Sequence, residues 1–414
     1  MELLQLASLL LVAAAAFGAV NYLFLKLPSA IGILIVALAA SFLIILTDAL
    51  FPVLVIEESI RSAVLEIEFS DTLLEGMLGL LLFAGALHVK VSDLRQEWLL
   101  VALMATIGVG LSTVIAGLGF GWLTGMPLMI ALVFGALISP TDPVAVLGVL
   151  RAADLPKTLE TKIAGESLFN DGVAYVAFLI LVGLAFGGSE SHVAGFEDAA
   201  LLFVREAIGG AVLGLLAGWS VWAVLRRVDD PVLEVLITLA LALGGYQLAV
   251  ALHVSAPIAA VCAGLLIGHE SRAGITEAGR DYVDTFWKLI DEILNAVLFL
   301  MIGAEVFAVA FSVDYLVAGL VSIGLSLLGR LAAVAIPVAI LRPFRGFPRG
   351  VVPIMTWGGI KGGISVALAL SLPETEYKPL ILTATYVVVI FSILVQGLTV
   401  TRVSERYGHE PELI

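Results

Sequence analysis

Residues 127–150 read PLMIALVFGALISPTDPVAVLGVL, and this stretch decides the fold. It is long and apolar enough to cross a hydrocarbon layer of roughly 30 Å as a helix. Its middle, Ser139-Pro140-Thr141-Asp142-Pro143, nevertheless places a carboxylate between two prolines. Proline removes a backbone donor and clashes with the preceding helical turn. The stretch therefore predicts a membrane-spanning helix that is interrupted halfway.

A second apolar stretch, residues 350–372, is interrupted by glycine. Its middle is Trp357-Gly358-Gly359-Ile360-Lys361-Gly362-Gly363, with four glycines around a cation. Interrupted helices expose half-helix ends, which are partly positive at N-termini and partly negative at C-termini. In transporters, paired broken helices from two repeats cross at the binding site. We therefore expect inverted repeats, with Asp142 and Lys361 compensating the exposed dipoles. A proline kink and a glycine packing face are the alternative, but neither requires a charge at the break.

The rest of the chain is equally apolar. Of its 414 residues, 61% are hydrophobic and only 14% are charged, against roughly 25% charged residues in a soluble domain. The composition predicts an all-α integral membrane protein with about 13 transmembrane helices. The predicted spans are roughly 3–25, 30–48, 71–89, 98–124, 127–150, 159–186, 205–226, 231–252, 256–269, 285–309, 315–341, 350–372 and 379–401. Residues 52–68 and 188–204 carry more charge and are predicted to be amphipathic and to lie on the membrane surface.

Basic residues are distributed unevenly between the two sides of these spans. Of the 21 Lys and Arg residues, all but five fall on one side. The other side has only Arg61, Arg205 and Lys378. Because basic residues favour the cytoplasmic side, we expect a multi-pass protein of the cell (inner) membrane with its N-terminus outside and a short cytoplasmic tail at 404–414. The net charge of −14 argues against nucleic acid as a partner.

Five ionisable side chains fall deep inside the predicted spans. Each costs about 2.5–3.5 kcal/mol on insertion scales, so such residues persist where they pair or function. At about 1.5 Å per residue, each lies near the middle of its helix and hence of the membrane. Their convergence at one depth, on four helices, predicts a single shared site. The five are Asp142, Glu166, Asp171, Arg330 and Lys361.

The sixth span carries Glu166-Ser167-Leu168-Phe169-Asn170-Asp171. Ser167, Asn170 and Asp171 share one helical face because they are three and four residues apart. Oxygen ligands of this kind suit a small, hard cation. Glu166 is offset from Asn170 by four residues and can reach a neighbouring helix. A structural salt bridge is the alternative explanation for Asp171.

Other polar residues give weaker signals. The five histidines lie at predicted helix ends or in loops without metal spacing, and Gly165-Glu166-Ser167 lacks the glycine of a hydrolase nucleophile elbow. An intramembrane hydrolase is therefore disfavoured, and we expect no enzyme and no cofactor. Glu305, near the outer end of span ten, is predicted to be solvated or interfacial. The single cysteine, Cys262, excludes an internal disulfide.

Pro140-Thr141-Asp142-Pro143 and Asn170-Asp171 resemble the cation–proton antiporter superfamily, and more closely its sodium/proton exchanger branch, which includes bacterial NhaP. The resemblance covers nearly the whole chain. Supporting stretches are Leu82–Leu87, Asn295–Phe299, Gly329-Arg330 and Trp357–Gly359. The resemblance implies a homodimer, with a dimerisation part at roughly 1–95 and 205–309 and a mobile core at roughly 96–204 and 310–403.

The same resemblance implies roles for the intramembrane residues. Na⁺ or a proton would be held by Asp171, Ser167 and the Thr141-Asp142 stretch, with Asn170 in support, and Glu166 would pair with Arg330. Two positions depart from the family pattern. Lys361 stands where the family usually has arginine, and a lysine is a point charge that cannot pair in a bidentate way. Ala84 stands where the family often has glutamate, which removes a possible accessory acid.

These expectations favour an electroneutral Na⁺/H⁺ antiporter that exchanges one cation for one proton by alternating access. Three negative and two positive side chains at the midplane leave one net negative charge for either ion to neutralise. A K⁺/H⁺ or Li⁺-tolerant antiporter with the same site is the first alternative. A cation channel is a second one, and it would conduct far faster than an antiporter turns over.

Overall fold

The structure is a computed structural model that describes residues 3–51, 72–142, 157–187, 196–274, 277–309, 312–348 and 350–408. The predicted surface segment 52–68 lies outside the described residues. So do residues 143–150, the second half of the first span that the sequence predicts to be interrupted. Everything that is described is helical or connects helices, in agreement with the predicted all-α class.

Helices occupy every predicted span, as far as the described residues reach. The N-terminal half contains α1 (Leu3–Val20), η1 (Asn21–Leu25), α2 (Ser29–Leu50), η2 (Thr72–Met77), α5 (Leu78–His88), α6 (Val91–Leu103), η3 (Met104–Gly108), α7 (Val109–Thr124), α8 (Leu128–Leu137) and α10 (Lys157–Phe186). The C-terminal half contains α11 (Phe196–Leu225), α12 (Pro231–Ala251), α13 (Ala256–Gly274), α14 (Glu277–Ala304), η5 (Glu305–Ala308), α15 (Val313–Leu341), α16 (Val351–Trp357), α17 (Gly363–Leu370), α18 (Lys378–Phe391), η6 (Ser392–Gln396) and α19 (Gly397–Gly408). Eight of the resulting helical stretches are long and apolar enough to cross a membrane.

Two helices extend beyond their predicted spans. Residues 196–204, expected on the membrane surface, form the first turns of α11 and run without a break into the predicted span. Asp198 lies in its first turn, where negative charge complements the helix dipole. At the other end of the chain, α19 continues to Gly408. The described part of the expected tail, residues 404–408, is therefore helical.

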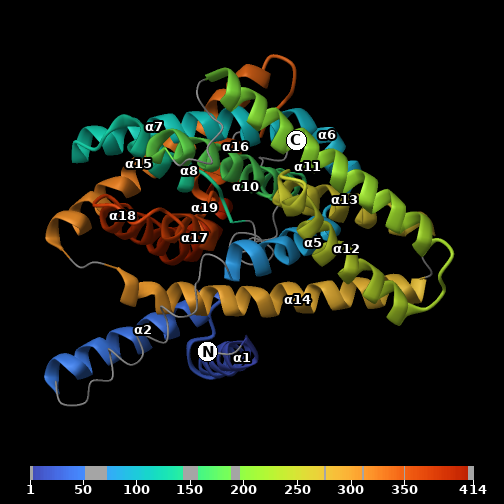
Figure 1. Ribbon diagram of the computed structural model, residues 1–414, viewed down its shortest axis with the longest axis horizontal. Helices are drawn as coiled ribbons and strands as arrows, with labels where there is room; N and C mark the ends of the chain where they lie inside the picture. The colour runs from blue at the N-terminus through green and yellow to red at the C-terminus, as the bar shows by residue number, and fades with distance from the viewer. Residues whose placement is uncertain are drawn as a thin grey trace.

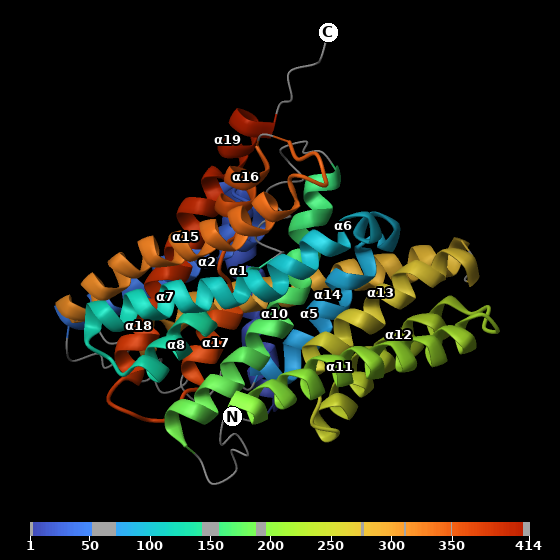
Figure 2. The same cartoon turned by 90° about the horizontal axis from the view of Figure 1, so that it is seen from above.

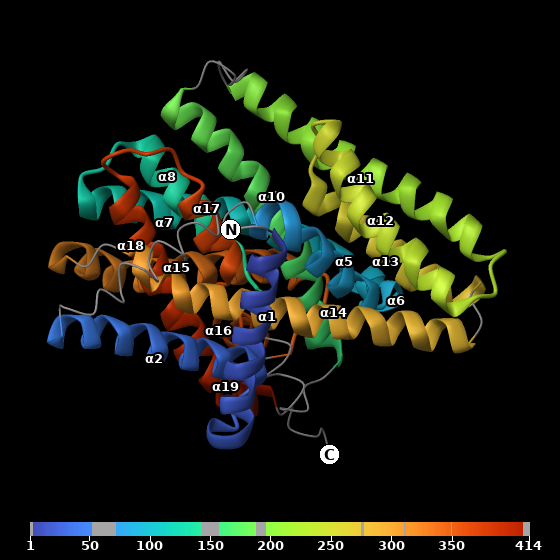
Figure 3. The same ribbon diagram turned by 60° about the horizontal axis from the view of Figure 1, so that its bottom comes forward.

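The helices form two flanks with α10 between them (Figures 1 and 2). On one flank, α13 packs against α5, α11 and α12. On the other flank, α7 packs against α8 and α15, and α15 also contacts α18. Helix α10 contacts α8 and α6 on one side and α11 and α13 on the other. Helix α14 runs beneath both flanks and contacts α2, α5 and α12 (Figure 3). This arrangement places the middle of α10 deep inside the molecule.

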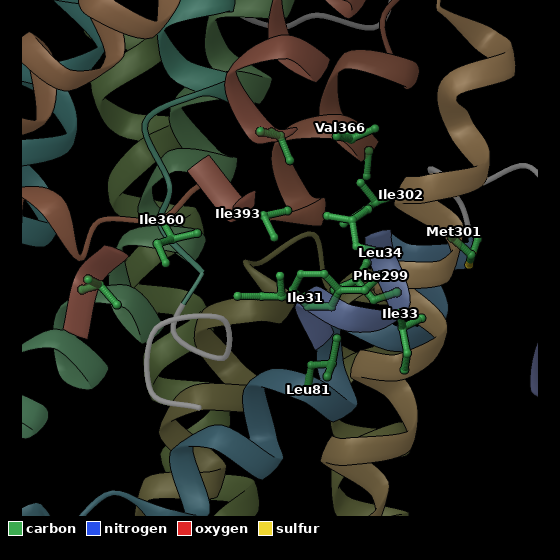
Figure 4. Close-up of a cluster of buried hydrophobic side chains, with 14 of the residues drawn as sticks. Ile31, Ile33, Leu34, Leu81, Phe299, Met301, Ile302, Ile360, Val366 and Ile393 are labelled. Atoms are coloured by element: carbon green, nitrogen blue, oxygen red, sulfur yellow. The ribbon is translucent and has the colours of Figure 1, made fainter. Parts of the chain in front are cut away.

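An apolar cluster joins the N-terminal helices to the second interrupted span. Figure 4 shows side chains from α2 and α14 packed towards the segment that contains Ile360 and towards α17 and η6. Its labelled members are Ile31, Ile33, Leu34, Leu81, Phe299, Met301, Ile302, Ile360, Val366 and Ile393. Because lipid tails are as apolar as these side chains, close van der Waals packing holds such helices together in a bilayer. The cluster thereby supports the unwound backbone from one side.

Candidate ion-binding site

The described backbone is non-helical at both predicted interruption points, and the two unwound segments touch. Helix α8 ends at Leu137, and the chain then runs without regular structure to Asp142. The second span is helical as α16 and α17 and unwound between Gly358 and Gly362. The backbone N–H of Asp142 donates to the carbonyl of Ile360 at 2.8 Å. One hydrogen bond therefore joins the two unwound segments directly.

The Lys361 side chain lies against the end of α8. Its ammonium donates to the carbonyls of Ser139 (2.9 Å) and Pro140 (3.2 Å), and the residue is only 2% exposed. These carbonyls follow the C-terminus of α8, where the helix dipole is negative. A point charge with rotatable donors suits two separate carbonyls, so lysine fits this position without the bidentate geometry of arginine.

Asp142 lies beside a helix N-terminus, where the helix dipole has the opposite sign. A methyl group built on Gly362 would come within 2.3 Å of Asp142 Oδ2, so the carboxylate lies directly against the backbone before α17. The N-terminus of α17 begins at the next residue, Gly363, where the dipole is positive. Glycine is required here because any side chain would displace the carboxylate. Asp142 and Lys361 thus lie at ends of opposite polarity.

Glu166 and Arg330 form a buried pair that also stabilises α16. Both guanidinium Nη atoms donate to the Glu166 carboxylate, one of them at 2.7 Å. Glu166 is 1% and Arg330 3% exposed. Arg330 Nε and Nη2 also donate to the carbonyl of Met355, at 3.1 and 3.0 Å, in the last turn of α16. Gly359 permits this approach, since a Cβ there would lie 2.1 Å from Arg330 Nε.

The remaining predicted residues surround Thr141. Asn170 Nδ2 donates to Thr141 Oγ1 at 2.7 Å, and Thr141 N–H donates to Asn170 Oδ1 at 3.3 Å. The hydroxyls of Thr141 and Ser167 share a hydrogen bond at 2.9 Å. Ser167 and Asn170 therefore hold the unwound segment onto α10.

Asp171 faces a small pocket. It is 2% exposed, and its Oδ1 has no hydrogen-bond partner among the described residues. Thr141 and Asp142 line the same pocket, whereas Ser167 and Asn170 are not among its lining residues. The rest of the lining is largely apolar, with Leu78, Leu81, Leu82, Leu168, Leu298 and Ile364. The pocket therefore presents a carboxylate oxygen in surroundings where a charge is costly.

Two polar residues that the sequence analysis did not single out complete the second break. Ser392 Oγ accepts from the Lys361 N–H at 2.8 Å and donates to Gln396 Oε1 at 2.5 Å. Gln396 Nε2 donates in turn to the carbonyl of Trp357 at 2.9 Å. The sequence did contain a signal for these two residues: they are polar and four residues apart in an apolar span, and such residues hydrogen-bond between membrane helices.

The expectation for Glu305 was wrong. It is 5% exposed, because α14 ends inside the molecule and not at its surface. The last turn of α14 is held by Ser41 of α2, which donates to the Gly303 carbonyl at 3.2 Å, and by Tyr386 of α18, which donates to the Ile302 carbonyl at 2.8 Å. The following turn, η5, therefore folds inward.

Two touching interrupted helices, with charges at their ends and a buried carboxylate beside them, define a secondary transporter. The sequence matches the family described as "Sodium/hydrogen exchanger, transmembrane" over residues 8–406. The chain belongs to this family of membrane transporters, so it is not an enzyme. The resemblance found in the sequence is thereby confirmed.

Individual relatives agree with this assignment. The chain is 46% identical to the Na⁺/H⁺ antiporter NhaP of Pseudomonas aeruginosa, over 95% of this chain and 94% of the relative. It is 33% identical to the Na⁺/H⁺ antiporter NhaH of Halobacillus dabanensis, over 93% of each. The fold is similar to that of the sodium proton antiporter MjNhaP1 from Methanocaldococcus jannaschii, with a TM-score of 0.78, 19% identity, and coverage of 99% of this chain and 100% of the other.

Proposed function

We propose that this protein exchanges one Na⁺ for one proton, without net movement of charge, and that Asp171 binds the two ions alternately. The observation that carries the proposal is the unpartnered Asp171 Oδ1 in the pocket. The Glu166 carboxylate, by contrast, is occupied by Arg330. Relatives that share most of their length with this chain are named Na⁺/H⁺ antiporters, which supports Na⁺ as the cation.

In this proposal the cation is bound at the edge of the first unwound segment. Asp171 supplies the charge, Thr141 and Asp142 supply further oxygens, and Ser167 supports Thr141 through the hydrogen bond between their hydroxyls. Asn170 fixes Thr141 through the pair of hydrogen bonds between them. Hard carboxylate and hydroxyl oxygens suit an alkali cation, and unwound segments at the membrane midplane are typical positions for such sites in transporters.

Counting the five charged side chains of the two unwound segments and of the adjacent turns of α10 and α15 supports a one-for-one exchange; Lys162, Glu234 and Glu305 are buried in other parts of the fold. Asp142, Glu166 and Asp171 contribute three negative charges, and Arg330 and Lys361 contribute two positive ones. One negative charge remains, which either a single monovalent cation or a single proton neutralises. An empty site would carry that charge through the hydrocarbon region at a high cost, so movement without an ion is suppressed.

The proposed transport cycle is an alternating-access movement within a homodimer. The mobile core comprises residues 96–204 and 310–403, and the dimerisation part comprises 1–95 and 205–309. The two helical flanks on either side of α10 support this division. The N-terminus lies outside the cell and the C-terminus in the cytoplasm, as the distribution of basic residues favours.

Voltage dependence tests this stoichiometry. In proteoliposomes, the initial rate of Na⁺-driven proton movement should stay constant when a membrane potential is imposed with valinomycin and a K⁺ gradient. K⁺ must first be shown not to be a substrate, and this control also tests the K⁺/H⁺ alternative. Li⁺ is offered in a parallel experiment to test the Li⁺-tolerant alternative. A rate that follows the imposed voltage would show that net charge moves, as expected if Lys361 also releases its proton during the cycle. Large currents in planar bilayers would instead indicate a channel.

A further inference from the structure

Two more oxygen atoms in the pocket have no role in the site described so far. They are Oδ1 of Asn295, in the middle of α14, and Oγ of Ser365, in the first turn of α17. Asn295 is 5% and Ser365 1% exposed, and neither oxygen has a hydrogen-bond partner among the described residues. Both residues line the same pocket as Thr141, Asp142 and Asp171.

The orientation of the Asn295 amide is fixed by its nitrogen. Nδ2 donates to the carbonyl of Asp291 at 2.7 Å and to Asp291 Oδ1 at 3.0 Å. The Asp291 carbonyl oxygen can only accept hydrogen bonds, and so can its carboxylate oxygen when the carboxylate is ionised. A flipped Asn295 amide would therefore place its oxygen against two other oxygens. The nitrogen is therefore held towards Asp291, and the carbonyl oxygen is the end that is left without a partner.

We propose that Asn295 Oδ1 and Ser365 Oγ are ligands of the transported cation, in addition to Asp171. The inference rests on the proposed function and extends its site to α14 and α17. A buried oxygen without a partner is unfavourable, and a dehydrated cation satisfies it because protein oxygens replace the lost hydration shell. Helix α14 contacts α17, so the two ligands approach the pocket from neighbouring helices.

Neutral ligands are also what the charge balance requires. The site needs several oxygens to replace the water around the cation, yet a further carboxylate would add a second negative charge. An amide oxygen and a hydroxyl complete the shell without changing the net charge at the midplane. They increase affinity for the cation over the proton, because a proton needs only Asp171. Water in the pocket is the competing explanation, since a buried water commonly bonds to polar groups that would otherwise be unsatisfied.

Transport kinetics of two variants distinguish a cation ligand from a water site. In proteoliposomes containing the full-length protein, Asn295→Ala and Ser365→Ala should each raise the apparent KM for Na⁺ by about tenfold, as expected when one interaction with a charged group is lost. The ratio of KM values for Li⁺ and Na⁺ should change as well. Ser371→Ala is the matched control, because Ser371 lies directly after α17 and its Oγ donates to the Leu368 carbonyl at 3.0 Å, outside the pocket lining. Its KM should not change.

A second variant separates ligand loss from poor folding. Ser365→Cys keeps the packing but replaces a hard oxygen with a soft sulfur, which is a weak ligand for Na⁺. It should melt like the unmodified protein without Na⁺ and gain less thermal stability when Na⁺ is added. If the unmodified protein exchanges Na⁺ but all three pocket variants keep its KM and Li⁺/Na⁺ ratio, the inference is overturned and the oxygens bind only water. If the unmodified protein shows no exchange, the proposed function itself fails.

Discussion

Asp171→Asn is expected to abolish Na⁺-driven proton movement while the protein still inserts and folds. The amide has the same shape as the carboxyl group but neither carries the negative charge nor binds a proton near neutral pH. Removing a buried charge lowers the cost of insertion, so loss of protein is not the expected phenotype. The measurement is the pH change inside proteoliposomes after a pulse of Na⁺, together with the thermal unfolding temperature in detergent.

Asp314→Asn serves as the control for this variant. Asp314 is exposed in the first turn of α15, so the same chemical change is made at a position outside the pocket. Its exchange rate should match that of the unmodified protein. Exchange by Asp171→Asn at a comparable rate would show that another group binds the ions.

Breaking the Glu166–Arg330 pair is expected to produce the largest loss of stability. Removing one partner leaves the other charge buried and uncompensated, which costs about 3–5 kcal/mol. Glu166→Gln and Arg330→Ala should therefore both unfold at lower temperature and transport more slowly. Arg330→Ala should be the more damaging, because it also leaves the Met355 carbonyl without its donors.

The double variant and a surface pair complete this test. Glu166→Gln combined with Arg330→Ala should regain part of the lost stability, since no charge is left unpaired. The recovery should be incomplete because the Met355 carbonyl still lacks the hydrogen bonds that Arg330 donates to it. The matched control is Glu374→Gln, which breaks the exposed pair of Glu374 with Lys378 at 2.6 Å. Exposed pairs contribute about 0–1 kcal/mol, so this variant should melt almost unchanged. If the Glu166 and Arg330 variants also melt unchanged, the pair has no structural role.

The interruptions could be predicted from sequence because the residues that make them are rarely found in mid-span. Proline on both sides of Asp142 and glycine on both sides of Lys361 are incompatible with a regular helix. Ionisable residues in apolar spans are similarly informative, since their cost in lipid leaves few reasons to retain them. These local signals sufficed to predict an all-helical membrane fold and the contact between two broken helices.

Tertiary contacts could not be predicted from the sequence. Helical spacing shows which residues share one face of a helix, but not which other helix packs against that face. Position in the chain suggested that Glu305 reaches the surface, but α2 and α18 enclose the end of α14. Ser167 has suitable chemistry for a ligand, yet in this structure its hydroxyl bonds to Thr141 and the residue does not line the pocket. Asn295 belongs to a stretch that resembled the family, but only the structure shows that its side chain lines the pocket.

The central claim is that a single carboxylate alternates between one cation and one proton. The protons released per Na⁺ bound test this most directly, and calorimetric titrations in buffers of different ionisation enthalpy measure them. We expect about one proton per Na⁺ at low pH, where Asp171 is protonated before Na⁺ arrives. The number should fall towards zero as the pH rises and the site empties of protons, and Asp171→Asn should release none. Release that approaches two protons, or that stays near zero at every pH where Na⁺ binds, would contradict the claim.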